Sequence, residues 1–295
     1  MAPHTWVLIL AGGTGRRLAE VTGGVPKQFW RAGGERTLLE RTLDRMAPLS
    51  SPSRTVVVVD QAHEPYVRSL GPKAGHVLYQ PRDRGTAAGV LLALLPILDA
   101  DPEAVVVMSP ADHGVTDFRE FRSGLLTVSR LVRRRRSGIV LFGAEPRGFD
   151  GSYGWIRPGR TCGPDWLRRV DAFVEKPGPE RAVELMDGRA VWNTMVLVAH
   201  GRSLFQFFVE RQPALTRALT DAWRCPELLR DEALAETYAR LSGLDFSHDV
   251  LTGAESLAVY TWPASMGWCD LGTPDRLHAW LEAPARPGRA ATSAA

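Results

Sequence analysis

The stretch that decides the fold is WVLILAGG, residues 6–13. Six apolar residues, most of them branched, run directly into a pair of glycines. A short apolar run of this kind predicts a strand that is buried on both faces, and the glycines predict a turn at its end. This turn is the first place along the chain where the backbone can approach a ligand closely.

Similar apolar runs recur along the first half of the chain. They predict strands at residues 55–60, 77–79, 104–108 and 139–143. Helices are expected between these strands, at residues 38–46, 86–98 and 118–136. This alternation is typical of a mostly parallel sheet with right-handed crossovers. Ligands of such sheets gather at the carboxyl ends of the strands, so the glycine turn after Ala11 and the aspartate Asp112 are expected at one edge.

The second half of the chain has shorter predicted elements. Strands are expected at residues 154–156, 170–174, 195–199 and 256–260, with a helical block at 203–241. The predicted fold is α/β, with a single Rossmann-like, mostly parallel mixed sheet flanked by helices. We expect one domain over residues 1–283 and a disordered tail at 284–295, which is rich in Ala, Pro, Gly and Arg.

The composition is that of an ordinary globular protein, with 44% hydrophobic and 23% charged residues in 295. A formal net charge of +3 does not indicate a nucleic-acid partner. The longest apolar runs are too short to span a bilayer, and the N-terminus lacks a signal-peptide pattern, so no membrane association is expected. Three cysteines, far apart and without metal-ligand spacing, favour a reducing, cytoplasmic setting.

The loop LAGGTGRRL, residues 10–18, carries three glycines and a pair of arginines just after a predicted strand. Glycine lets the backbone turn its N–H groups toward a phosphate, and Arg17 adds charge-assisted donors. The loop lacks the ending of a P-loop and the spacing of the dinucleotide fingerprint, so the glycines alone fit a plain turn equally well. Lys27, about a dozen residues further on, can reach the same anion, although a single loop lysine is more often solvated.

The string from Leu10 to Phe29 resembles the signature of sugar-nucleotide pyrophosphorylases, the sugar-1-phosphate nucleotidyltransferase family. Its Pro-Lys-Gln-Phe form is most similar to the mannose-1-phosphate guanylyltransferase (GDP-mannose pyrophosphorylase) branch. Six further motifs of the family follow in the family's order, as far as about Leu281. They are QPRDRGTA (80–87), PADH (110–113), YGWI (153–156), FVEKP (173–177), WNT (192–194) and WCDLGT (268–273). One such tetrapeptide could arise by chance, but seven motifs in order are hard to explain in that way.

The resemblance implies a nucleotide-diphospho-sugar transferase (GT-A-like) fold, with a nucleotide-binding half at residues 1–145 and a sugar-binding half at 146–283. It also implies a reaction in which a sugar 1-phosphate attacks the α-phosphorus of a nucleoside triphosphate and pyrophosphate leaves. The attacking phosphate is already anionic near pH 7, with a second pKa of roughly 6. No general base is needed, so positioning and electrostatics should supply most of the catalysis.

Residue roles follow from the same resemblance. The residues expected to bind the nucleotide are Ala11, Gly12, Gly13, Thr14, Gly15, Arg17, Lys27, Gln80, Gly85, Thr86 and Asp112. Those expected to bind the sugar phosphate are Gly154, Glu175, Lys176 and Asn193. Asp112 and Asp270 would share one Mg²⁺ ion, the expected cofactor, because carboxylate oxygens suit this hard cation. The catalytic set is then Arg17, Lys27, Asp112, Lys176 and Asp270.

Several of these residues also have simpler interpretations. Asp112 fits a helix cap, Asp270 a turn residue, and Lys176 plain surface. His113 is expected to hold its loop rather than bind metal, and Cys269 to be a small packed residue. The run of four arginines at 133–136 is expected to be a solvated helix end favoured by the helix dipole, with nucleic-acid or membrane binding as the weaker alternative.

The substrate pair is less constrained than the reaction. Pro26-Lys27-Gln28-Phe29 favours GTP and mannose 1-phosphate, whereas Gln80-Pro81 followed by Gly85 resembles the thymidylyltransferase relatives. The stretch 247–251 lacks the acidic end of the corresponding family segment, which leaves the sugar open. No carboxyl-terminal β-helix extension is expected after Asp270. The oligomeric state is also open, a homo-oligomer included.

Three other functions fit parts of the same sequence. A catalytically silent relative that senses sugar nucleotides would not require the charged set above. A cytidylyltransferase of isoprenoid synthesis also has a glycine-rich loop followed by Pro-Lys-Gln, but the motifs at 173–177 and 192–194 favour the sugar-nucleotide reaction. A nucleic-acid-binding module would use the arginine run and would bind in a strongly salt-dependent way.

Overall fold

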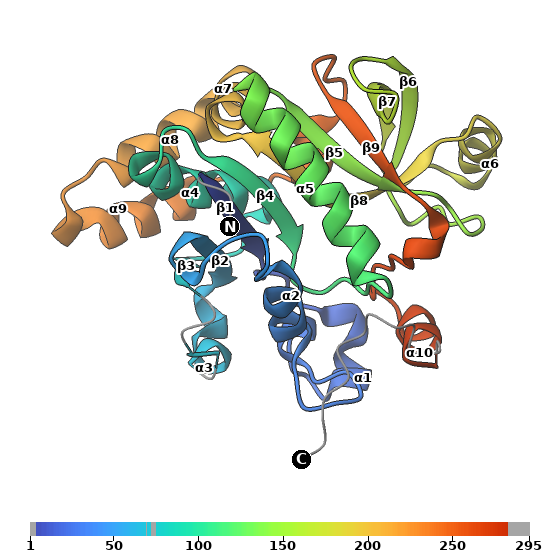
Figure 1. Ribbon diagram of the computed structural model, residues 1–295. Coiled ribbons are helices and arrows are strands. Elements are labelled where there is room, and N and C mark those ends of the chain that lie inside the picture. Colours follow the sequence, from blue (N-terminus) through green and yellow to red (C-terminus); the bar gives the residue numbers. More distant parts are fainter. Residues whose placement is uncertain (1–3, 69, 72–74, 283–295) are drawn as a thin grey trace.

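The computed structural model describes residues 4–68, 70–71 and 75–282, so the predicted tail at 284–295 lies outside the described residues. Their strands form one nine-stranded sheet in the order β3-β2-β1-β4-β8-β5-β9-β7-β6. The strands are β1 (Thr5–Leu10), β2 (Thr55–Asp60), β3 (His76–Gln80), β4 (Val105–Pro110), β5 (Ile139–Ala144), β6 (Trp155–Thr161), β7 (Leu167–Val174), β8 (Val191–His200) and β9 (Ala258–Trp262). Figure 1 shows the sheet running through the whole molecule.

The first four strands form the parallel sheet that the sequence predicts. β1 pairs in parallel with β2 and β4, and β2 pairs in parallel with β3. Every residue of β4 is buried, in agreement with the apolar run that opens it, and Ser109 is its one polar residue. The carboxyl ends of β1 and β4 therefore meet at one edge of the sheet, where the glycine turn and Asp112 follow them.

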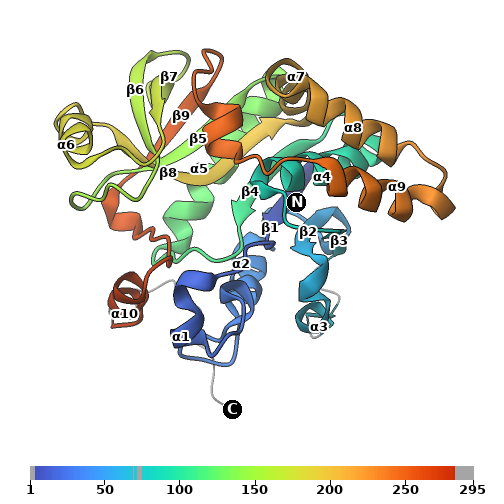
Figure 2. The same cartoon turned by 180° about the vertical axis from the view of Figure 1, so that it is seen from behind.

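Helices cover both faces of this sheet. Figure 1 shows α5 (Phe118–Arg135) across one face, where it shares a core with α2 (Leu38–Met46). Figure 2 shows α4 (Gly85–Ala100), α7 (Gly201–Arg211) and α8 (Pro213–Trp223) on the other. Successive residues of β1 alternate between the two cores, with Leu8 in one and Ile9 in the other. This alternation is the reason that the strand is apolar at every position.

The expectation of a mostly parallel sheet is wrong for the second half. β8 inserts antiparallel between β4 and β5, and the hairpin of β6 and β7 adds further antiparallel pairs. Of the nine strand pairings, four are parallel and five are antiparallel. The β6–β7 pair is a hairpin, whose short connection reverses the chain, whereas β8 reaches its antiparallel position through a longer connection that includes a helix. Strand β5, from the first half of the sequence, lies between β8 and β9 of the second half.

The remaining helices include several that the sequence analysis did not predict. The expected helical block is divided into α7, α8 and α9 (Glu227–Arg240). The unpredicted helices are α1 (Ala19–Thr22), α3 (Glu64–Val67), α6 (Pro179–Asp187) and α10 (Pro274–Glu282). Proline at the first position of α6 and α10 fits the helix start, because the missing N–H has no partner there anyway. Among the described residues, no helix is long and apolar enough to cross a bilayer.

Candidate active site

The glycine loop at the end of β1 is held close to Lys27. Gly15 adopts a φ of 65°, a left-handed conformation that favours glycine. A Cβ atom at this position would lie 2.8 Å from the backbone nitrogen of Lys27. Thr14 and Arg17 lie on the same loop and are exposed. The glycine therefore brings the lysine segment against the loop, as the short sequence separation suggested.

Two buried amides hold this loop from behind. Gln28 donates from Nε2 to the carbonyl oxygens of Ala11, at 2.7 Å, and Gly13, at 2.9 Å. Gln80 lies against Gly12, where a Cβ would come within 2.9 Å of the Gln80 Nε2 atom. Gln28 thus holds the loop through hydrogen bonds and Gln80 lies close against it, and both side chains are almost fully inaccessible to solvent. Sequence reasoning gave Gln28 no role, although its place within the Pro-Lys-Gln-Phe motif could have suggested one.

The two aspartates expected to bind metal come together around Lys27. The Lys27 Nζ atom lies 2.9 Å from Asp112 Oδ2 and 3.7 Å from Asp270 Oδ1. The lysine side chain is only 8% exposed, whereas the two carboxylates remain partly accessible. Residues from the two halves of the sequence therefore converge on one point. That point attracts positive charge, because an ammonium group already occupies it.

A short backbone bridge places these carboxylates. Gly114 donates to the carbonyl of Cys269 at 2.8 Å, and Cys269 donates back to Gly114 at 3.0 Å. A Cβ atom on Gly114 would lie 2.5 Å from Trp280 of α10, so glycine is required for this approach. The indole of Trp268 also donates to His113 Nδ1 at 3.2 Å. The turn that carries Asp112 is therefore locked to the segment that carries Asp270.

The charge states of this cluster follow from burial and from Lys27. Burial by itself would raise the pKa of Asp112, but the Lys27 ammonium, His113 and hydrogen bonds to the carboxylate together hold that pKa below its usual value. Burial lowers the pKa of His113 to about 4, so this ring is neutral at pH 7 and can accept the Trp268 hydrogen bond. Burial also raises the pKa of the Cys269 thiol to about 11. The cysteine is therefore a protonated, poorly nucleophilic group.

The predicted sugar-side residues lie together at the ends of β6, β7 and β8. Glu175 Oε1 is 3.3 Å from Lys176 Nζ, and the lysine side chain is 66% exposed. A Cβ atom on Gly154 would lie 2.5 Å from Glu175 Oε2, so this glycine makes room for the carboxylate. Asn193 donates from its backbone N–H to Gly154 at 2.7 Å and from Nδ2 to Ser247 Oγ at 3.1 Å. Burial raises the pKa of Glu175, although Lys176 opposes this change.

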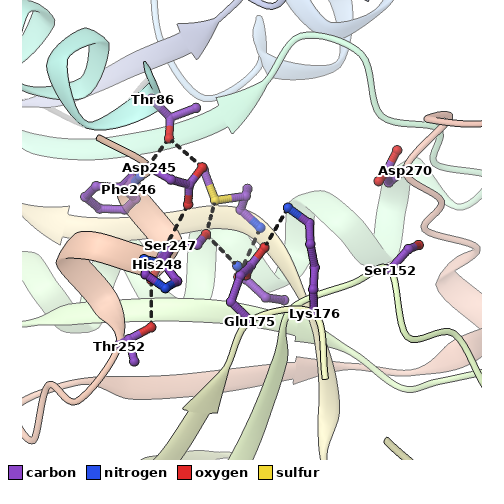
Figure 3. Close-up of polar contacts among 12 residues, drawn as sticks. Thr86, Ser152, Glu175, Lys176, Asp245, Phe246, Ser247, His248, Thr252 and Asp270 are labelled. Carbon is purple, nitrogen blue, oxygen red and sulfur yellow. Dashed lines mark hydrogen bonds and ion pairs between the residues drawn. The ribbon is translucent and has the colours of Figure 1, made fainter. Parts of the chain in front are cut away.

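The start of α4 is tied to a segment from the far end of the chain. Thr86 donates from Oγ1 to Asp245 Oδ2 at 3.3 Å and accepts the backbone N–H of Phe246 at 2.7 Å. Gly85 has a φ of 78° and packs closely against the carbonyl of Leu244. In the view of Figure 3, Glu175 and Lys176 lie between this contact and Asp270. Thr86, Lys176 and Asp270, one from each predicted set, thus lie in the same part of this view.

Comparison with known sequences identifies the family. The family model described as Nucleotidyl transferase matches residues 6–284. The chain belongs to the nucleotidyl transferase family. The family predicted from the seven motifs is therefore confirmed.

Two curated proteins are similar to this nucleotidyl transferase over most of its length. It is 27% identical to a mannose-1-phosphate guanylyltransferase of Sinorhizobium fredii and 26% identical to the xanthan biosynthesis protein XanB of Xanthomonas campestris. The matches cover 93% and 90% of this chain but only 54% and 57% of the relatives. The chain thus spans little more than half the length of these curated relatives.

Solved structures agree with the sequence comparison. A Thermus thermophilus protein described as a mannose-1-phosphate geranyltransferase is 31% identical, with a TM-score of 0.81 over 91% of this chain and 76% of the other. A UDP-glucose pyrophosphorylase complexed with UDP-glucose is 14% identical, with a TM-score of 0.58 over 94% of this chain and 97% of the other. At that identity the second match shows a common fold.

The arginine run of this nucleotidyl transferase lies at the end of α5 with Arg134, Arg135 and Arg136 exposed, in agreement with the expected solvated helix end. Arg133 donates to Thr5 Oγ1 at 2.6 Å, and Arg136 forms an ion pair with Glu103 at 2.6 Å. Arg135 donates to the carbonyl of Cys162 at 3.5 Å. Three of the four arginines therefore have partners within the protein.

Proposed function

We propose that this nucleotidyl transferase joins a sugar 1-phosphate to a nucleoside triphosphate and releases pyrophosphate, with mannose 1-phosphate and GTP as its substrates. One observation carries the proposal: Asp112 and Asp270, from opposite halves of the sequence, converge on the same buried cation, Lys27. The names of the relatives support the choice of mannose 1-phosphate and GTP.

The proposed reaction needs two polyanions to be held together. A phosphate oxygen of the sugar 1-phosphate forms a bond to the α-phosphorus, the bond from that phosphorus to the bridging oxygen breaks, and pyrophosphate takes the electron pair. The backbone of the glycine loop and Arg17 would hold the triphosphate, and Lys176 the sugar phosphate. Lys27 would offset the negative charge at the reacting phosphates, so the chain's own cations lower the repulsion between the substrates.

The residues around Lys27 fit a bound Mg²⁺ ion. Asp112 and Asp270 offer carboxylate oxygens, which this hard cation prefers, and Lys27 shows that the position accepts positive charge. No group of three or more metal-ligating side chains is found in residues 4–68, 70–71 and 75–282. Two carboxylates suit an ion that takes its other ligands from phosphates and water. The ion would neutralise charge on the phosphates.

The alternative of a thymidylyl or other base specificity has its own support in Gln80. The thymine edge presents one donor between two acceptors, whereas guanine presents two adjacent donors beside an acceptor. A neutral amide with one acceptor oxygen and an NH₂ group suits thymine, and a carboxylate would suit guanine better. Gln80 is buried, and Tyr238 donates to its Oε1 atom at 3.3 Å. The amide is therefore fixed in orientation beside the loop.

A substrate grid tests the proposal. Five nucleoside triphosphates are paired with common sugar 1-phosphates in the presence of Mg²⁺, and pyrophosphate release is measured. We expect the highest kcat/KM for GTP with mannose 1-phosphate. A preference for dTTP would replace the base assignment with the alternative. Binding of nucleotides without pyrophosphate release from any pair would contradict the enzymatic proposal and favour a silent, ligand-sensing relative.

A further inference from the structure

Arg276 of α10 contacts the metal-binding aspartate proposed above from the side that Lys27 leaves open. Its Nη1 atom lies 3.5 Å from Asp270 Oδ2, whereas Lys27 lies 3.7 Å from Asp270 Oδ1. Each oxygen of this carboxylate therefore faces a different cation. The arginine side chain is only 15% exposed, so solvent screens its charge weakly. None of the family motifs recognised in the sequence contains Arg276.

The same guanidinium also holds the turn that leads into the sugar side. Its Nη2 atom donates to Asp150 Oδ2 and to Ser152 Oγ. Its Cζ atom lies 4.1 Å from the centroid of the Tyr153 ring, a cation–π contact. These three residues directly precede Gly154, which lies against Glu175. One side chain thus links the metal-binding aspartate to the segment that positions the sugar-side carboxylate.

The shape of the arginine side chain explains why Arg276 can contact Asp270 and the 150–153 turn at the same time. Its planar fork presents donors in fixed directions, whereas a lysine ammonium is a single point of charge on a flexible stem. The Nη2 atom of Arg276 donates its hydrogen bonds to the 150–153 turn. The Nη1 end is buried and has no hydrogen-bond partner among the described residues. The Asp270 carboxylate lies beside this Nη1 atom. A small rotation of the Asp270 side chain would therefore complete a hydrogen bond from Nη1 to Oδ2.

We propose that Arg276 is a positioning residue that orients Asp270 toward the shared cation and couples this orientation to the 150–153 turn of the sugar side. The proposal rests on the function proposed above. The coupling predicts that loss of the fork affects the use of Mg²⁺ and of the sugar 1-phosphate together. Nucleotide binding should change little, because the glycine loop is held by Gln28 and Gln80 instead.

The direction in which the cation affinity changes on loss of Arg276 tests whether this residue positions Asp270. Removal of a positive charge near a carboxylate pair would, by itself, strengthen the binding of a divalent cation. Loss of the group that orients a metal ligand weakens binding, by about tenfold or more. In Arg276→Met we therefore expect the affinity for Mn²⁺, measured by electron paramagnetic resonance without substrates, to fall about tenfold. An unchanged or higher affinity in a folded variant would overturn the proposal.

Steady-state kinetics test the coupling. In Arg276→Met we expect the KM values for Mg²⁺ and the sugar 1-phosphate to rise about tenfold each, with the nucleotide KM within about twofold of wild type. Arg276→Lys keeps the charge but not the fork. We therefore expect either the KM for Mg²⁺ or the KM for the sugar 1-phosphate to recover, but not both. Full recovery of both, or an equal rise in all three KM values, would show that the fork does not couple the two sides.

Arg147→Met is the matched control. Its guanidinium is exposed and, within the part of the chain that the structure describes, donates to the carbonyl of Ala264, so we expect no change in the three KM values. Wild type turning over no substrate pair would defeat the proposed function. The Mn²⁺ comparison would still decide whether Arg276 positions Asp270, so the two failures are distinguishable.

Discussion

The two sides of the site are built in different ways. On the nucleotide side the backbone of the glycine loop is fixed by the buried amides of Gln28 and Gln80. On the sugar side the groups are charged side chains that differ in exposure: the Lys176 side chain is 66% exposed, whereas that of its partner Glu175 is 17% exposed. Backbone donors held in place cost little ordering on binding, whereas long exposed side chains lose rotamer freedom. On binding a ligand, the Lys176 side chain would therefore lose more rotamer freedom than the loop backbone would.

Asp112 and Asp270 both contact Lys27 in the proposed metal site, and their loss should have the largest effect. We expect Asp270→Asn or Asp112→Asn to lower kcat by roughly 10³-fold or more, because the amide removes charge from the proposed Mg²⁺ site. Pyrophosphate release measures the effect, and circular dichroism checks the fold. Asp275→Asn on α10 is a charge-matched control. Near-normal turnover in a folded Asp270→Asn protein would refute the metal assignment.

Lys27 should show effects of opposite sign on turnover and on cation binding. In Lys27→Met we expect kcat/KM to fall roughly 10²-fold, because the substrates lose a buried positive charge. Without substrates, the same variant should bind Mn²⁺ more tightly than wild type, because the ammonium no longer competes for the two carboxylates. Weaker Mn²⁺ binding would mean that the lysine supports the cation site rather than filling it. Arg276→Met is predicted to change Mn²⁺ affinity in the other direction.

Lys176 tests the sugar side alone. In Lys176→Gln we expect the KM for the sugar 1-phosphate to rise roughly tenfold, the effect of one lost charge-assisted hydrogen bond. The melting temperature should not change, because this side chain is mostly exposed. A similar rise in the nucleotide KM would break the contrast between the two sides.

Gln28 tests the nucleotide side alone, with the smallest expected effect on turnover. Gln28→Leu removes the donor that two loop carbonyls share. We expect the free energy of unfolding to fall by about 1–3 kcal/mol and the nucleotide KM to rise several-fold. Urea denaturation and initial rates measure the two quantities. If the KM for the sugar 1-phosphate rose as much as that for the nucleotide, the loop would not be specific to the nucleotide side.

Local sequence patterns were sufficient to predict the first strands, the glycine loop and the family. Apolar runs located β1, β2 and β4, because a strand buried on both faces must be apolar throughout. The glycine loop was recognisable because Gly15 adopts a left-handed conformation that favours glycine. The order of the seven motifs was sufficient to identify the family.

Local sequence patterns did not predict which distant segments of the chain contact one another. The antiparallel insertion of β8 between β4 and β5 has no local signal, because a strand has the same apolar pattern in either direction. The bridge between Gly114 and Cys269 brings the two aspartates together, and Arg276 joins one of them to the 150–153 turn. The Gly114–Cys269 and Asp150–Arg276 contacts join residues more than a hundred positions apart. Their register depends on how the whole sheet and α10 pack, and no local pattern encodes it.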